Sequence, residues 1–205
     1  VNVQGWGETV TTTGYGQAGL GNPSDPRQRY TTGFNGTSSA SPTVVGAILA
    51  IQGVLKANAG DPLTPAQMRQ LLIDSGTAQT GVDHIGPLPN VPAALALIPP
   101  RIEVTSPNGG EQWSAGTSET VTWTEFNLPE TDGIFVWLFD NGGTGWHQLA
   151  GPIPPGTKTA SVTLPNISTN DSAIVLGSWT GSEYTVTDGS DAAFSVVFID
   201  TDGDG

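Results

Sequence analysis

The sequence predicts two folds in one chain: an α/β segment over residues 1–98 and an all-β sandwich over residues 101–197. Apolar residues follow a helical period in the first segment and a period of two in the second. The charge changes at the same point. Residues 1–100 contain five acidic and four basic residues, whereas residues 101–205 contain fourteen and two. Pro99-Pro100 is typical of a linker between the two segments.

Composition excludes several classes of partner. The chain of 205 residues has a net charge of −13, which argues against nucleic acid and anionic membranes as partners. It contains no cysteine, so it has neither disulfides nor thiolate metal sites. No run reaches the ~18 apolar residues of a membrane span, so none is expected. The chain begins at Val1 and stops after Asp204-Gly205, and we expect both ends to be cut from a longer protein.

The sequence of the first segment predicts both strands and helices. Residues 1–7 alternate and end in glycines, which predicts a strand. Residues 11–35 predict a surface loop that ends in a short strand. From about Ser38 to Asn58 apolar residues surround a 3.6-residue period, which predicts a helix buried in a core. Thr64-Pro65 predicts the cap and first residue of a second helix.

The start of the predicted core helix carries more hydroxyl groups than capping needs. Those groups belong to Thr37, Ser38, Ser39 and Ser41. One N-cap oxygen satisfies only one or two backbone N–H groups. Gly36 and Ala40 are small enough for a peptide to approach the hydroxyl between them, and Pro42 is tolerated in a first turn. A serine here would direct its Oγ outward, and its own N–H would face an oxyanion at the positive end of the helix dipole.

Residues 35–42 read N-G-T-S-S-A-S-P and match the G-T-S-x-A-S-P signature of subtilases, the subtilisin-like serine proteases. The first segment resembles the C-terminal part of their catalytic domain. The resemblance implies that Ser38 is the acyl-forming nucleophile, that its N–H is an oxyanion-hole donor, and that substrates are polypeptides. It implies no cofactor for catalysis. Supporting motif residues are Asn35, Gly36, Thr37, Ala40, Ser41 and Pro42. The resemblance and the low lysine content together favour an extracellular or cell-surface protein.

Subtilases place the Asp and His of their triad before the serine. Only two carboxylates, Glu8 and Asp25, precede Ser38 in this chain, and its first histidine is His84. The side-chain amide that completes the oxyanion hole of the family should also lie upstream. The sequence thus contains one of three triad members and one of two oxyanion donors, so we expect negligible peptidase activity from this chain alone.

Two alternatives remain at this point. Ser38, Asp74 or Asp83, and His84 follow the order Ser, acid, His of α/β-hydrolases, although that fold needs G-x-S-x-G and here Ala40 takes the fifth position. The other alternative is a non-catalytic extracellular adhesion protein, or a carbohydrate- or protein-binding protein, that carries a relic protease segment.

The second segment contains seven strand-like runs separated by turn residues, which predicts a β-sandwich. The runs are residues 102–104, 120–123, 134–139, 160–164, 173–176, 184–186 and 193–197. The sequence S-P-N-G-G-E-Q-W at residues 106–113, with V-T-W at 121–123, resembles an immunoglobulin-like module of secreted microbial proteins. It is similar to domains of fungal Ser/Thr-rich wall-anchored proteins.

Five of the six tryptophans lie in this second segment. Trp123 and Trp137 occur in apolar alternations, so we expect them in the core. Trp113, Trp146 and Trp179 lie near turns and are candidates to stack on sugars or anchor a partner. A carbohydrate or a cell-surface component is therefore a candidate ligand of the sandwich.

Residues 198–205 form an acidic tail. Asp200, Asp202 and Asp204 are spaced as in the first half of a calcium loop, but the later bidentate Glu is missing. The tail resembles the start of a calcium-binding repeat. We expect at most weak calcium binding here and no firm metal site elsewhere.

Overall fold

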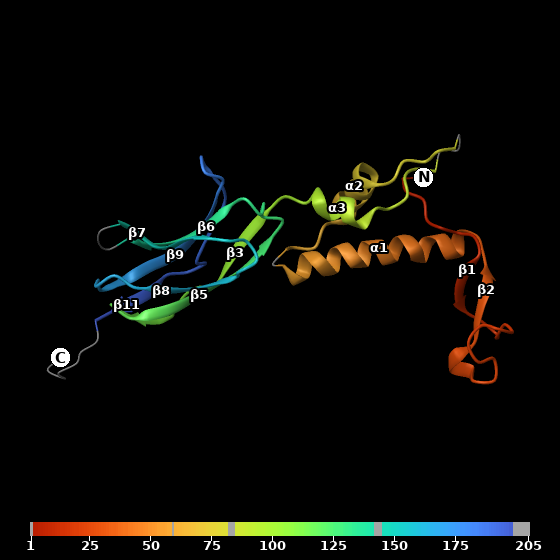
Figure 1. The fold of residues 1–205 in the computed structure, drawn as a ribbon, viewed down its shortest axis with the longest axis horizontal. Helices are drawn as coiled ribbons and strands as arrows, with labels where there is room; N and C mark the ends of the chain where they lie inside the picture. Colours follow the sequence, from red (N-terminus) through yellow and green to blue (C-terminus); the bar gives the residue numbers. More distant parts are fainter. Residues whose placement is uncertain (1, 59, 82–84, 142–144, 199–205) are drawn as a thin grey trace. The chain divides into compact units, whose positions relative to one another are not determined.

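The chain divides into two units, residues 1–98 and residues 99–205. The computed structural model describes residues 2–58, 60–81, 85–141 and 145–198. Figure 1 shows the fold of each unit. Among the described residues, the first unit contains helices and one small sheet, and the second unit contains strands alone.

The elements of the first unit are β1 (Val10–Thr13), η1 (Pro26–Gln28), β2 (Tyr30–Phe34), α1 (Thr37–Ala57), α2 (Pro65–Ser75) and α3 (Val91–Ala96). β1 and β2 pair antiparallel, and β2 is the short strand predicted before the serine motif. Residues 2–7 form no strand, although the sequence predicted one over residues 1–7. The Gln4 N–H donates to the Pro87 carbonyl (2.9 Å) and the Gly7 carbonyl accepts from the Gly36 N–H (2.7 Å), and these separate bonds do not make the ladder that a strand requires.

α2 begins at the predicted residues. The Thr64 hydroxyl accepts from the Gln67 N–H at 3.3 Å, and the Gln67 side chain accepts from the Thr64 N–H at 2.9 Å. This reciprocal capping box satisfies two N–H groups that the first turn would otherwise leave free. Met68 and Leu72 are buried one turn apart on the same face. The helix is therefore held by a cap at its start and by one apolar stripe.

α1 has the predicted length but is not a buried helix. Val45 and Leu49 expose 49% and 65% of their surfaces, and the buried apolar residues, Ile51 and Leu55, lie near its C-terminal end. Its apolar residues surround the helix, whereas α3 packs against one part of it (Figure 1). Apolar periodicity shows which surfaces need covering but supplies no partner, and so the prediction of burial is wrong for most of α1.

α1 is also long and apolar enough to span a membrane, with a mean hydropathy of 1.4 over an 18-residue window. It is the one such helix in the described parts of the chain. No membrane-spanning helix was expected from the sequence. Core helices of soluble proteins have the same length and hydropathy, so these two properties do not distinguish a span from a core helix.

The second unit consists of nine described strands in two sheets. The strands are β3 (Arg101–Ser106), β4 (Gln112–Ser114), β5 (Ser118–Phe126), β6 (Gly133–Asp140), β7 (Gly145–Ile153), β8 (Thr159–Thr163), β9 (Thr169–Trp179), β10 (Tyr184–Gly189) and β11 (Phe194–Val197). The larger sheet has the order β4-β11-β9-β6-β7, with β10 also paired to β9, and the smaller has the order β3-β5-β8. β4 and β11 pair parallel, and the other pairs are antiparallel.

All seven predicted strands are present, and two further strands were not predicted. β4 has three residues, too few to show a period. β7 contains Gly151-Pro152, and proline within a run argues against a central strand. β7 lies at the edge of the larger sheet, where a proline without an N–H interrupts no hydrogen bond between strands.

Side chains from both sheets form one apolar core. It contains Ile102, Val104, Val121, Trp123 and Val162 from the smaller sheet, and Trp113, Ile134, Val136, Leu138, Ile174, Leu176, Phe194 and Val196 from the larger, together with Leu164. The core position predicted for Trp123 is confirmed. Trp113 is also buried, 5.0 Å from the Phe194 ring, so it is not a ligand contact. Trp137 lies outside this core, so its predicted burial there is wrong. The immunoglobulin-like assignment of this unit stays a prediction.

Candidate active site

The turn before α1 places the serine motif at the start of a long helix. Gly36 is the residue before the first helical turn, with φ 95° and ψ −171°. Only glycine adopts this backbone region without strain. A Cβ added at Gly36 would meet no atom within 4 Å, so backbone conformation, and not space, requires glycine here. The chain thus turns sharply into α1 immediately before Thr37 and Ser38.

Residues 5–9 lie against this turn and fix it. The Gly36 N–H donates to the Gly7 carbonyl at 2.7 Å, and the Asn35 side chain accepts from the Thr9 N–H at 2.6 Å. A Cβ at Gly5 would lie 2.3 Å from the Ala40 carbonyl oxygen. The glycines of the G-W-G sequence therefore allow two backbones to approach closely. From the sequence, these glycines indicated only the end of a strand.

Neighbouring serines of the motif have different surroundings. Ser39 is buried, and its hydroxyl donates to the Gly36 carbonyl at 2.8 Å and to the Gly7 carbonyl at 3.1 Å. Ser38 and Ser41 are exposed. Ser39 therefore holds the turn together, whereas the hydroxyl of Ser38 is accessible, as a nucleophile must be.

The backbone around Ser38 offers hydrogen-bond donors. Ser38 is the second residue of α1, and no side chain of the described residues caps this helix end. The first N–H groups of a helix have no partner within the helix, and a helix of 21 residues adds its dipole at this end. Thus the Ser38 N–H lies where a negative charge is stabilised.

Pro42 has a different place from the one expected. It is the sixth residue of α1, beyond the first turn, so it removes the N–H that would bond to the carbonyl of Ser38.

Thr37 and Ala40 lie closer to the N-terminus of α1. They line a hollow of about 610 Å³ that is also bounded by Gly7, Glu8, Thr9, Asn35 and Gly36. Open space therefore adjoins the turn that presents Ser38.

The geometry and the motif can be compared with known proteins. Residues 7–86 match the model of the subtilase family.

This match covers the turn, α1 and α2, and it ends before α3 and the second unit. A search of curated proteins found no match. The subtilase segment thus contains every residue of the predicted serine site, and the β-rich unit lies outside it.

The described part of the subtilase segment shows no partner that could activate the serine. No hydrogen bond in it joins the Ser38 hydroxyl to a histidine or a carboxylate. Asp74, the acid of the α/β-hydrolase alternative, accepts from the Gln70 amide at 2.8 Å. Asp83 and His84 lie outside the described residues. The structure therefore gives this alternative no contact that supports it.

Metal ligands were predicted only in the acidic tail. Asp200, Asp202 and Asp204 lie outside the described residues. Within the described ranges, no group of three or more His, Asp or Glu side chains could hold a metal ion.

Proposed function

We propose that the parent protein of this chain is a subtilisin-like serine endopeptidase whose nucleophile is Ser38. One observation carries the proposal: an accessible serine follows a glycine-only turn at the start of a long helix, inside the segment that matches the subtilase family. The buried Ser39 and the bonds from residues 5–9 support it, because they hold this turn in one conformation before substrate binds.

In this mechanism Ser38 Oγ attacks the carbonyl carbon of the scissile peptide bond. A histidine that precedes residue 1 in the parent protein takes the hydroxyl proton and then donates it to the leaving amine. The Ser38 N–H donates to the oxyanion of the tetrahedral intermediate, assisted by the helix dipole. The acyl-enzyme is then hydrolysed by water. The required Asp, His and second oxyanion donor come from outside this chain.

The proposal is tested by peptidase assays on the parent protein, the longer polypeptide. Ser38→Ala should lower kcat by a factor on the order of 10⁶, as removal of a triad serine does. Ser24→Ala is the control, because Ser24 is an exposed serine of the segment that matches the subtilase family but lies outside the serine motif, so this variant should keep full activity. The chain of 205 residues alone should show no inhibitor-sensitive cleavage of casein.

Ser39→Ala tests whether Ser39 stabilises the turn without taking part in peptide cleavage. It removes the hydroxyl proton that the Gly36 and Gly7 carbonyls share, and so we expect lower thermal stability together with measurable activity. Full activity of the Ser38→Ala protein, or inhibitor-sensitive cleavage by the 205-residue chain, would contradict the proposal. Absence of peptidase activity from the parent protein itself would favour the relic-protease alternative.

We also propose an extracellular or cell-surface location, which the subtilase match and the low lysine content support. Calcium binding by Asp200, Asp202 and Asp204 stays a prediction. Calorimetric titration of the parent protein with calcium would test it, and the absence of binding heat would remove it.

A further inference from the structure

The larger sheet of the second unit has an aromatic outer face. Along β6, Ile134, Val136 and Leu138 are fully buried in the core. Side chains alternate along a strand, so the residues between them point away from the core. Those residues are Phe135, Trp137 and Phe139. Both faces of β6 are therefore apolar, although one core covers only one of them.

Neighbouring strands extend this face. Trp137 lies opposite Gln148 of β7 and Val175 of β9, and Phe139 lies opposite Trp146. The Phe139 and Trp146 ring centroids are 4.8 Å apart. At the other end of the face, Tyr184 packs on Trp179 at 4.8 Å and on Phe135 at 6.3 Å. Two ring clusters thus flank Trp137.

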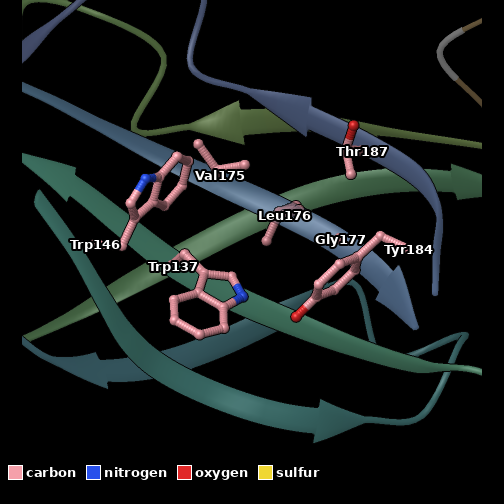
Figure 2. Close-up of a pocket in the computed structure, with 7 residues that line it drawn as sticks. All are labelled: Trp137, Trp146, Val175, Leu176, Gly177, Tyr184 and Thr187. Carbon is pink, nitrogen blue, oxygen red and sulfur yellow. The ribbon is translucent and has the colours of Figure 1, made fainter. Parts of the chain in front are cut away.

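A hollow of about 290 Å³ lies between these clusters. Figure 2 shows Trp137 between Trp146 and Tyr184, with Val175 and Thr187 nearby. Gly177 forms part of its lining, and a Cβ there would lie 2.6 Å from the Tyr184 ring. Glycine therefore lets the ring lie close over β9. Trp146 and Tyr184 remain 57% and 42% exposed, so the edges of the hollow are accessible aromatic surface.

The hollow has no charge in a strongly acidic unit. Residues 101–205 contain fourteen acidic and two basic residues, yet none of the residues that line the hollow is ionisable near neutral pH. The acidic surroundings disfavour anionic ligands, and a cationic peptide would find no carboxylate in the hollow to pair with. The uncharged lining and its acidic surroundings therefore favour a neutral ligand over an anionic or a cationic one.

We propose that this aromatic face binds a neutral polysaccharide. A pyranose ring presents apolar C–H faces and a rim of hydroxyl groups. The C–H faces would stack on Trp137, Trp146 and Tyr184, and a flat aromatic surface supplies large contact area at low entropic cost. Gln148, on the same face as Trp137, and Thr187 can bond to the hydroxyl rim. The proposal does not depend on peptidase activity.

The test is retention of the full 205-residue chain on insoluble microcrystalline cellulose, chitin and β-1,3-glucan. We expect retention on at least one of these probes. Trp146→Ala should weaken it about tenfold or more, as expected for a central aromatic anchor. Trp137→Ala should do the same. Trp6→Ala is the matched control, since Trp6 is 65% exposed and lies in the other unit.

Further measurements exclude a folding artefact and other occupants. Trp146 lies outside the core and packs on the Phe139 ring, so Trp146→Ala should lower the urea unfolding midpoint only slightly. The proposal is overturned if the chain is retained on none of the three polysaccharides, or if Trp146→Ala is retained as well as the unsubstituted chain. It is also overturned if Trp146→Ala instead abolishes binding to denatured casein, or converts a dimer to a monomer in light scattering.

Discussion

In the second unit Ile134, Val136 and Leu138 are fully buried, whereas in α1 of the first unit Leu49 exposes 65% of its surface. Side chains from both sheets cover one another in the second unit, whereas the described residues leave most of the circumference of α1 without such a partner. The first unit nevertheless forms a defined serine turn through backbone bonds and close glycine contacts. Local hydrogen bonds can thus shape a site whose supporting core is incomplete, but they do not supply the stability of a full core.

The largest expected effect is loss of a core ring in the second unit. Phe194 is 1% exposed and packs against Trp113. Phe194→Ala should lower the free energy of unfolding by about 3–5 kcal/mol, because a large buried ring is replaced by a cavity. Urea unfolding followed by tryptophan fluorescence measures this change, since five of the six tryptophans lie in this unit.

Leu49→Ala is the matched substitution in the first unit. We expect a change of about 0.5 kcal/mol or less, because the side chain is mostly exposed and its removal creates no cavity. Circular dichroism at the helix band follows it. If Leu49→Ala cost as much as Phe194→Ala, α1 would be packed in solution, and the contrast between the units would be wrong.

An effect smaller than that of Phe194→Ala is expected at a buried carboxylate of the second unit. Glu125 is 7% exposed, accepts from the Trp123 indole N–H at 3.0 Å, and accepts from the Gly156 N–H. Glu125→Ala should cost about 2–3 kcal/mol, because it leaves two donors without partners. Glu125→Gln keeps an acceptor oxygen and should cost less.

Asp25 provides the comparison in the first unit. Its carboxylate pairs with Arg27 at 2.9 Å, and hydrogen bonds from the Arg27 side chain and backbone lower the pKa of Asp25. Asp25→Asn should not measurably change stability, because exposed ion pairs contribute little. Equal losses for Asp25→Asn and Glu125→Ala in urea unfolding would refute this ranking.

A further effect concerns pH. Burial raises the pKa of Glu111. Hydrogen bonds from N–H groups, including those of Asn108 and Gly109 at 2.8 and 2.7 Å, lower this pKa by more than burial raises it, so that it lies below its ordinary value of 4.5. The ionised form is therefore favoured in the folded state. Its stabilising effect, about 1 kcal/mol or less, is present above pH 4.5 and is lost as pH falls through the lowered pKa.

Glu111→Gln tests this dependence. The difference in unfolding free energy between Glu111→Gln and the unsubstituted chain should be largest near pH 7 and shrink below pH 4.5. A difference that grows on acidification would show that the Asn108 and Gly109 N–H groups do not stabilise the carboxylate.

Several features were predictable because their causes are local. The Thr64 cap acts over three residues, and the spacing of the serine motif specifies a turn into a helix. Strand alternation likewise identified β6. In each case the interacting groups are close in sequence, so the local sequence pattern shows which groups interact.

Other features depended on distant partners. β6 is apolar on both faces, so alternation alone could not show that Leu138 faces the core and Trp137 the outer surface. For α1, the apolar pattern predicted a need for burial that the described residues do not meet. The bond between Thr9 and Asn35 joins residues 26 positions apart, and no local pattern indicated it.

The most direct test of the account is covalent labelling with a fluorophosphonate, followed by mass spectrometry of the tryptic peptide from Tyr30 to Lys56. In the parent protein the label should be found on Ser38 alone. In the 205-residue chain this peptide should remain unlabelled, because under the proposed function the base that activates the hydroxyl comes from outside this chain. Label on Ser39 or Ser41, no label in the parent protein, or label on Ser38 of the isolated chain would contradict the assignment.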